Sequence, residues 1–299
     1  MKNLRHYITK AKKERWVIGQ FNFSDFSQVK GIVQAAQNLS SPIILGTSEG
    51  ESKFVGLQEA VAIRDVLRKK TSLPIFLNLD HGKSFSAKDG SASGGEYSYI
   101  KEAILAGYDM VCFDGSKLPL KENIKISKEV VVFAKKRGVL VEGEVGRFGT
   151  DASRVYQEKF EIKEENLTNP KEAKDYVKKT GVDILAVSIG TFHGIDIGSV
   201  SPNIRLDRLK EIQNAVHIPL VLHGGSGTPE TDVLEAIKLG IIKININTEL
   251  RIAFSHALRR SLENNKEEIT PYKYLPQAVN ATTKITEKYI KLFGSQNKA

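Results

Sequence analysis

The sequence has one cysteine, Cys112, and therefore cannot form an intramolecular disulfide. A chain so poor in cysteine is typical of a reducing cytoplasm, which is where we expect it to act. It has no apolar run of about 18 residues, so no membrane partner is expected. The N-terminal segment MKNLRHYITKAKKERW has no apolar core between its charges and does not have the pattern of a signal peptide.

The sequence also lacks a basic run interleaved with aromatic residues, although its formal net charge is +9. Nucleic-acid binding would rest on charge alone, and we do not expect it. Lysines spread along the chain would instead help to attract an anionic substrate, such as a phosphorylated sugar.

Short apolar runs alternate with amphipathic helical patterns along the chain. Strands that alternate with helices pair in parallel through right-handed crossovers. Eight such runs in 299 residues predict an α/β fold, a single (β/α)8 TIM barrel over residues 1–299. The predicted strands are Val17–Phe21, Pro42–Gly46, Pro74–Leu79, Met110–Phe113, Val139–Val141, Ile184–Val187, Pro219–Leu222 and Ile242–Ile246.

The predicted helices show apolar residues at spacings of three and four. They are Gln28–Asn38, Leu57–Lys69, Tyr99–Leu105, Asn123–Lys136, Pro170–Lys179, Arg205–Ala215, Glu230–Leu239 and Leu250–Asn264. Two polar segments, 83–97 and 147–166, follow strands and are predicted to be irregular loops on the same rim.

Three histidines, His81, His193 and His223, each follow a predicted strand. The C-terminal ends of barrel strands face one side, where active sites lie, so these imidazoles should converge. Catalytic Zn²⁺ takes three protein ligands and keeps one position open, which this set would match. Each histidine alone could be structural. Asp80, beside His81, could transfer protons at the metal or could orient a ligand.

Further carboxylates follow two other strands. Asp114 ends one run, and Glu142 and Glu144 end the next. They are compatible with partners of the metal ligands or with an alternative metal site.

Two segments after the last strands favour phosphate binding. His223–Gly227 is rich in glycine, and Asn245–Thr248 leads into a predicted helix. In barrels of this type, backbone N–H groups of these two loops and a helix N-terminus often bind phosphate. Ordinary turn formation would explain the same glycines.

Several motifs taken together resemble the class II fructose-bisphosphate aldolases, over about Ile18 to Phe293. They are IGQFNFSD at 18–25, SPIILGTSEG at 41–50, LDHG at 79–82, VEGEVG at 141–146, SIGTFHG at 188–194, LVLHGGSG at 220–227 and KININTELR at 243–251. The resemblance implies a zinc-dependent aldolase that cleaves fructose 1,6-bisphosphate reversibly.

The resemblance also implies roles for individual residues. His81, His193 and His223 match the zinc ligands. Asp80 matches the residue that moves the C4 hydroxyl proton, and Asn245 matches one that holds the enediolate of dihydroxyacetone phosphate. The remaining matches are a second, buried metal position at Asp114 and Glu144, a phosphate cradle at Gly194, Gly224, Ser226 and Thr248, and substrate contacts at Asn22, Ser48, Asn247 and Arg251. A monovalent cation near the phosphate and a homodimer or higher homo-oligomer are implied by analogy.

The chain departs from the family pattern in one loop. Ala152 stands where the family carries a glutamate that moves the C3 proton, and Asp151 or Glu158 could substitute for it. The position of Asn247 bears on which sugar epimer is accepted, whereas Arg251 favours fructose 1,6-bisphosphate. The alternatives are an aldolase for tagatose 1,6-bisphosphate or another ketose phosphate, and a metal- and phosphate-binding homologue with weak turnover.

Overall fold

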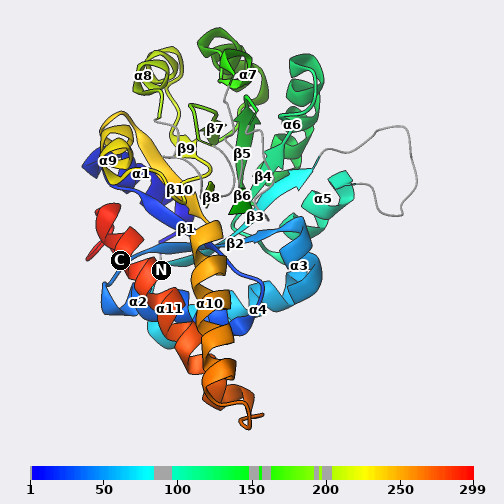
Figure 1. The fold of residues 1–299 in the computed structure, drawn as a ribbon. Coiled ribbons are helices and arrows are strands. Elements are labelled where there is room, and N and C mark those ends of the chain that lie inside the picture. Colours follow the sequence, from blue (N-terminus) through cyan, green and yellow to red (C-terminus); the bar gives the residue numbers. More distant parts are fainter. Residues whose placement is uncertain (1, 84–95, 148–154, 157–162, 192–194, 197–203) are drawn as a thin grey trace.

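The computed structural model describes residues 2–83, 96–147, 155–156, 163–191, 195–196 and 204–299. Eight parallel strands in these residues close into a barrel (Figure 1). They are β1 (Ile18–Asn22), β2 (Ile43–Ser48), β3 (Ile75–Lys83), β4 (Met110–Asp114), β5 (Leu140–Val145), β7 (Ile184–Val187), β9 (Leu220–Leu222) and β10 (Ile241–Ile246). Their spatial order is β1-β10-β9-β7-β5-β4-β3-β2, so the predicted TIM barrel is confirmed.

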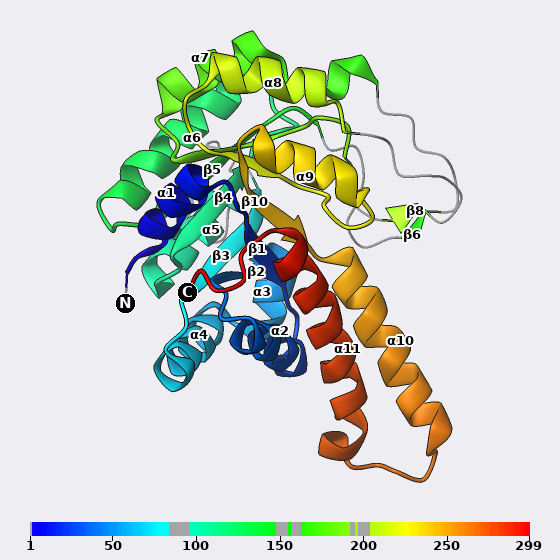
Figure 2. The same ribbon diagram turned by 90° about the vertical axis from the view of Figure 1, so that its left-hand side faces the viewer.

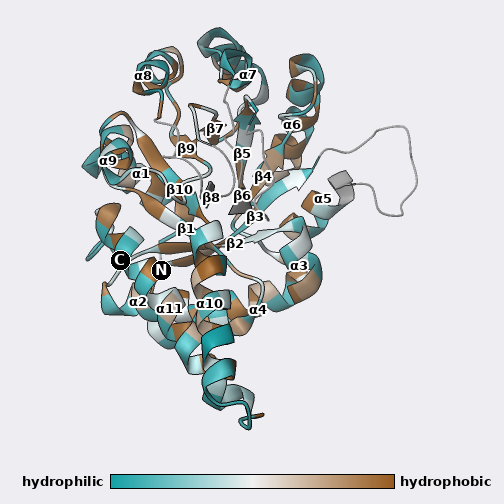
Figure 3. Ribbon diagram, viewed as in Figure 1, coloured by the Kyte–Doolittle hydropathy of each residue, from teal (hydrophilic) through white to brown (hydrophobic). Residues whose placement is uncertain are grey.

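Helices surround the barrel, and every predicted helix is present with ends that differ by a few residues. They are α2 (Phe26–Asn38), α4 (Leu57–Thr71), α5 (Glu96–Ala106), α6 (Leu120–Lys135), α7 (Pro170–Thr180), α8 (Leu206–Ala215), α9 (Glu230–Lys238), α10 (Thr248–Asn264) and α11 (Pro271–Leu292). Hydrophobic residues dominate the strands and hydrophilic residues the outer helices (Figure 3). The last two helices pack along each other and project from the barrel (Figure 2). No helix in the described ranges is long and apolar enough to cross a membrane.

Three helices were not predicted, α1 (Leu4–Glu14), α3 (Glu49–Val55) and α11. The first begins after Asn3, whose side chain accepts a hydrogen bond from the N–H of His6. Its buried residues Leu4, Tyr7, Ile8 and Ala11 join one hydrophobic cluster with the first inward-facing residues of the strands. It therefore closes the N-terminal end of the barrel, opposite to the predicted active site.

The interior of the barrel changes from apolar to polar along its axis. Side chains alternate between the two faces of a strand, so every second residue points inward. The first inward layer is apolar and contains Ile18, Ile44, Phe76, Met110, Leu140 and Ile184. The next layer contains the buried residues Gln20, Asn78, Cys112, Glu142 and Lys243. The third lies at the C-terminal mouth and contains the buried residues Asn22, Asp80, Glu144 and Asn245 and the partly buried Asp114.

The two predicted loops are only partly described. In 83–97, Lys83 belongs to β3 and Glu96 begins α5, while 84–95 lies outside the described residues. In 147–166, the prediction of an irregular loop throughout was wrong. Val155–Tyr156 forms β6, which pairs in parallel with β8 (Ile195–Asp196), and Glu164–Asn166 forms a 3-10 helix. Even a polar, aperiodic segment can form a short ladder of backbone hydrogen bonds.

Candidate metal centre

His81 reaches the barrel mouth through a local break in the regular β-strand. Strand β3 continues past Leu79, where the prediction ended it, and its register with β4 shifts between Leu79 and Gly82. His81 has φ +50, a left-handed conformation that is uncommon for a residue with a side chain. Consecutive residues of a regular strand face opposite sides, so this irregularity allows both Asp80 and His81 to face the mouth.

Gly82 makes this irregularity possible. A Cβ atom on Gly82 would lie 2.9 Å from the carbonyl oxygen of Cys112 and 2.7 Å from a side-chain carbon of Ile100. Any larger residue would push β3 away from β4 at the position next to His81. The glycine of the LDHG motif therefore has a structural role beside Asp80 and His81.

His223 follows β9 and is completely buried. Its Nε2 lies 2.6 Å from Oε1 of Glu142, and Oε2 of that carboxylate lies 2.9 Å from Nζ of Lys243. Burial opposes the charge on Glu142, but Lys243 and His223 outweigh it and lower its pKa to about 2. An ionised carboxylate only accepts hydrogen bonds, so Nε2 of His223 donates, and Nδ1 is the nitrogen whose lone pair suits a metal ion.

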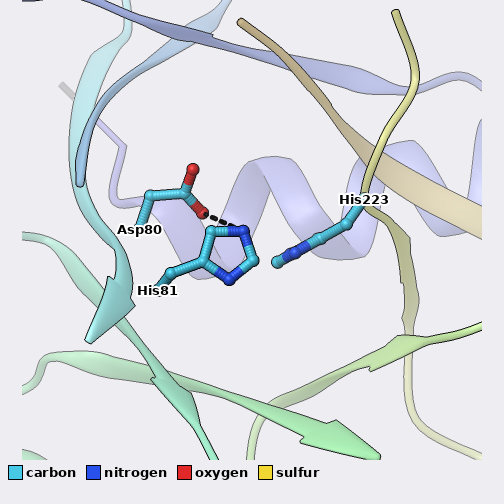
Figure 4. A group of neighbouring side chains, drawn as sticks. All are labelled: Asp80, His81 and His223. Carbon is cyan, nitrogen blue, oxygen red and sulfur yellow. Dashed lines mark ion pairs between the residues drawn. The ribbon is translucent and has the colours of Figure 1, made fainter. Parts of the chain in front are cut away.

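The two histidines and Asp80 meet at the mouth (Figure 4). One ligand atom from each of Asp80, His81 and His223 lies within 4.8 Å of the others. The two imidazole rings are edge to face, with centroids 4.5 Å apart. Imidazole nitrogens and a carboxylate form a donor set that suits a divalent transition metal. The third predicted ligand, His193, lies outside the described residues.

A second group shares His81. Its Nδ1 lies 3.6 Å from Oδ2 of Asp114 and 3.4 Å from Oε2 of Glu144, and the three residues could hold a metal ion together. Burial, and next the charge of Asp114, raise the pKa of Glu144 to about 8. This cluster of carboxylates favours an added positive charge, which a cation would provide.

Two side-chain amides orient the carboxylate of Asp80. Asn22 donates to Oδ2 at 3.0 Å, and Asn245 donates to Oδ1 at 2.9 Å. Burial disfavours a charge on Asp80, but His81, His223 and other neighbours outweigh burial, so its pKa lies well below the usual range. Asp80 is therefore ionised, and an amide holds each of its two carboxylate oxygens.

Lys243 connects these two arrangements. Its ammonium group pairs with Glu142 and also donates to Oδ1 of Asn245 at 2.7 Å. Its side chain is only 1% exposed. We did not single it out from the sequence, although a lysine inside the apolar run IIKINI, at an inward position, was a usable signal.

The predicted phosphate site begins at Gly224, the residue after His223. Gly224 has φ +67, which glycine tolerates and other residues rarely adopt. A Cβ atom on Gly225 would lie 2.4 Å from the side chain of Ile244, so the loop packs directly on β10. Ser226 and Thr248 are both buried, the latter at the first position of α10, where helix N–H groups favour anions. Gly194 lies outside the described residues.

The four predicted substrate contacts gather around an acidic residue that the sequence did not reveal. Asn22, Ser48, Asn247 and Arg251 all contact the buried carboxylate of Glu51. Ser48 also lies opposite Asp80 in the pairing of β2 with β3. The only sequence signal was the S-x-x-E spacing of a helix capping box at Ser48–Glu51, which does not by itself indicate a binding site.

Comparison with known proteins agrees with this geometry. The family model described as fructose-bisphosphate aldolase class-II matches residues 2–298. Proteins named fructose-bisphosphate aldolase from Staphylococcus aureus (strain Mu50) and Staphylococcus epidermidis (strain RP62A) are each 35% identical over 300 residues, which cover 99% of this chain and 98% of the relative.

Solved structures show the same fold. The YdjI aldolase from Escherichia coli K12 has a TM-score of 0.78 and 28% identity, and the match covers 100% of this chain and 99% of that chain. The fructose-bisphosphate aldolase from Campylobacter jejuni has a TM-score of 0.81 at 21% identity, with 99% and 95% coverage. The second likeness concerns the fold alone.

Proposed function

Because the chain belongs to the class II fructose-bisphosphate aldolase family, we propose that it reversibly cleaves fructose 1,6-bisphosphate. The products would be dihydroxyacetone phosphate and glyceraldehyde 3-phosphate. The observation that carries this proposal is the convergence of Asp80, His81 and His223 at the C-terminal mouth of the barrel.

The metal that we propose is Zn²⁺. His81 and His223 would hold it together with His193, and Asp114 and Glu144 would contribute to a second position with His81. When bound, the ion supplies a Lewis acid that polarises the ketone oxygen of the substrate. The donor set supports this proposal because Glu142 orients His223, and such partners fix the ligand nitrogen. A monovalent cation near the phosphate is a further proposal by analogy with the family.

Asp80 would exchange the C4 hydroxyl proton. In cleavage it accepts this proton, and in condensation it returns it to the same oxygen. The two amides that hold Asp80 and its depressed pKa support this role, since the carboxylate is charged and oriented before the substrate binds. Asn245, which donates to Asp80, is also placed to hold an oxygen of the enediolate.

The phosphate groups would lie at two ends of the mouth. Gly194, Gly224, Ser226 and Thr248 would bind the phosphate of the dihydroxyacetone half. Asn22, Ser48 and Asn247 would contact the sugar, and Arg251 the distal phosphate. The C3 proton remains unassigned, because Asp151, Ala152 and Glu158 all lie outside the described residues.

We propose further that residues 1–299 act as one catalytic domain in a homodimer or higher homo-oligomer. Support for one domain comes from both ends of the chain, since α1 closes the barrel and α11 packs on α2. Arg251 on α10 motivates the oligomer, since the family often shares this residue between subunits.

The test is cleavage of fructose 1,6-bisphosphate by the purified protein, before and after a chelator and after Zn²⁺ is added back. We expect cleavage that the chelator abolishes and Zn²⁺ restores. Tagatose 1,6-bisphosphate, assayed in parallel, tests the epimer. Cleavage that persists after complete removal of metal would overturn the proposed chemistry.

A further inference from the structure

Glu51 is a buried carboxylate at the barrel mouth, with a side chain 6% exposed. Its Oε2 accepts hydrogen bonds from the N–H of Ser48 at 2.7 Å and from Nδ2 of Asn22 at 3.1 Å. Its Oε1 lies 2.5 Å from Nη2 of Arg251, and Nδ2 of Asn247 donates to the same oxygen at 3.4 Å. One carboxylate therefore touches all four proposed contacts of the sugar and its distal phosphate.

Helix capping explains only half of this arrangement. Ser48 and Glu51 form a capping box at the start of α3, and that interaction uses Oε2. Oε1 is not needed for the cap, yet it pairs with Arg251 on α10, 200 positions away in the chain. The guanidinium side chain is 30% exposed, so an anion can approach it from the solvent side.

We propose that Glu51 determines substrate specificity by competing with the distal phosphate for Arg251. A phosphate at Arg251 would have to displace a buried carboxylate or lie next to its negative charge, and both are unfavourable. We expect the phosphate of the dihydroxyacetone half to be less affected, because Gly224 and Ser226 of its proposed cradle follow β9 and only Thr248 lies on α10. The site would thus accept ketose 1-phosphates whose far end carries a hydroxyl group nearly as well as a bisphosphate.

This inference rests on the proposed function, and Glu51→Gln tests it. The amide oxygen can still accept the N–H of Ser48, while the charge beside Arg251 is removed. A hydrogen bond between charged groups corresponds to roughly a tenfold effect or more on affinity. We expect kcat/KM for fructose 1,6-bisphosphate to rise about tenfold and that for fructose 1-phosphate to change less than about twofold.

Glu49→Gln is the matched control. Glu49 is a second buried glutamate of the same helix, but its Oε1 accepts the N–H of Lys83 and contacts none of the four proposed substrate residues in the described structure. Its replacement should leave the ratio between bisphosphate and monophosphate unchanged. An equal rise in that ratio in both variants would show a general effect of helix charge and overturn the proposal.

Binding separates this inference from the proposed function. Hexitol 1,6-bisphosphate and hexitol 1-phosphate have no ketone and cannot be cleaved, so calorimetry with both measures selectivity without turnover. The Glu51→Gln variant should gain about tenfold in affinity for the bisphosphate alone. An unchanged affinity ratio would overturn the role of Glu51, whether or not the protein cleaves fructose 1,6-bisphosphate.

Arg251→Met gives a second test that does not depend on the folding of Glu51→Gln. If Glu51 already occupies the guanidinium, this change should lower bisphosphate selectivity by less than about tenfold. A loss beyond about a hundredfold would mean that Arg251 is fully available to the phosphate, and would refute the competition.

Discussion

Replacement of Lys243 by methionine tests whether the buried Lys243–Glu142 pair organises the site. The two side chains are 1% and 0% exposed, and the charged atoms are 2.9 Å apart. At an effective dielectric constant of about 20, Coulomb's law gives an attraction of about 6 kcal/mol at this distance. Desolvation offsets part of it, and removal of one partner from a buried pair typically costs about 3–5 kcal/mol. We expect Lys243→Met to lower the free energy of unfolding by that amount.

The double variant Glu142→Gln, Lys243→Met separates stability from positioning. It removes both charges, so the free energy of unfolding should recover to within about 1–2 kcal/mol of the original protein. Chemical denaturation of metal-free protein measures this recovery. Zinc affinity, measured by competition with a chelating dye, should remain about 10–100-fold weaker than that of the original protein, because the carboxylate that orients His223 is no longer present.

Two results would refute this reasoning. If Lys243→Met unfolds as readily as the original protein within about 1 kcal/mol, the ion pair does not contribute as its burial implies. If the double variant binds zinc as tightly as the original protein, Glu142 does not orient His223 for the metal.

Three further changes test other parts of the structure. Asp80→Asn should lower kcat by about 10²–10⁴-fold and leave zinc stoichiometry unchanged, because it removes the proton acceptor but not the ligands that we propose; an unaltered kcat would exclude the role. Gly82→Ala should weaken zinc binding and lower the melting temperature, because its methyl group would meet Ile100 and the carbonyl of Cys112; a variant of normal zinc affinity would show that β3 can relax. Trp16 is 2% exposed and belongs to the hydrophobic cluster that α1 forms at the N-terminal end of the barrel, so Trp16→Ala should lower the free energy of unfolding by about 3–5 kcal/mol, measured with denaturant, and leave KM unchanged; an altered KM would show that this end of the barrel affects the mouth.

The barrel strands were predictable because parallel strands that are buried on both faces appear in the sequence as continuous apolar runs. Ile184–Val187 is one example, and the structure places β7 at the predicted residues. Helix α1 was not predicted because five of the eleven residues of LRHYITKAKKE are charged. Its apolar positions Leu4, Tyr7, Ile8 and Ala11 nevertheless have helical spacing, so the signal was present.

The positions of the candidate site residues that the structure describes were predictable to the extent that these residues end strands. His81 and His223 converge as expected because parallel strands share one C-terminal face. The left-handed backbone of His81 was not predictable, since it depends on the packing of β3 against β4. Glu51 was missed for a different reason: its spacing from Ser48 fully explains a helix cap, and only the fold brings Arg251 to its second oxygen.

The polar layer in the middle of the barrel lies between the apolar end and the mouth that carries the candidate site. Aliphatic side chains there would avoid the desolvation of Glu142 and Lys243, and such replacements of buried pairs are often neutral or stabilising. The pair instead fixes two groups at the mouth, since Glu142 contacts His223 and Lys243 contacts Asn245. Stability would therefore favour apolar side chains in this layer, whereas the geometry of the site requires the Glu142–Lys243 pair. An apolar replacement of the pair should give a barrel at least as stable as the original, with a site whose ligands are no longer held in place.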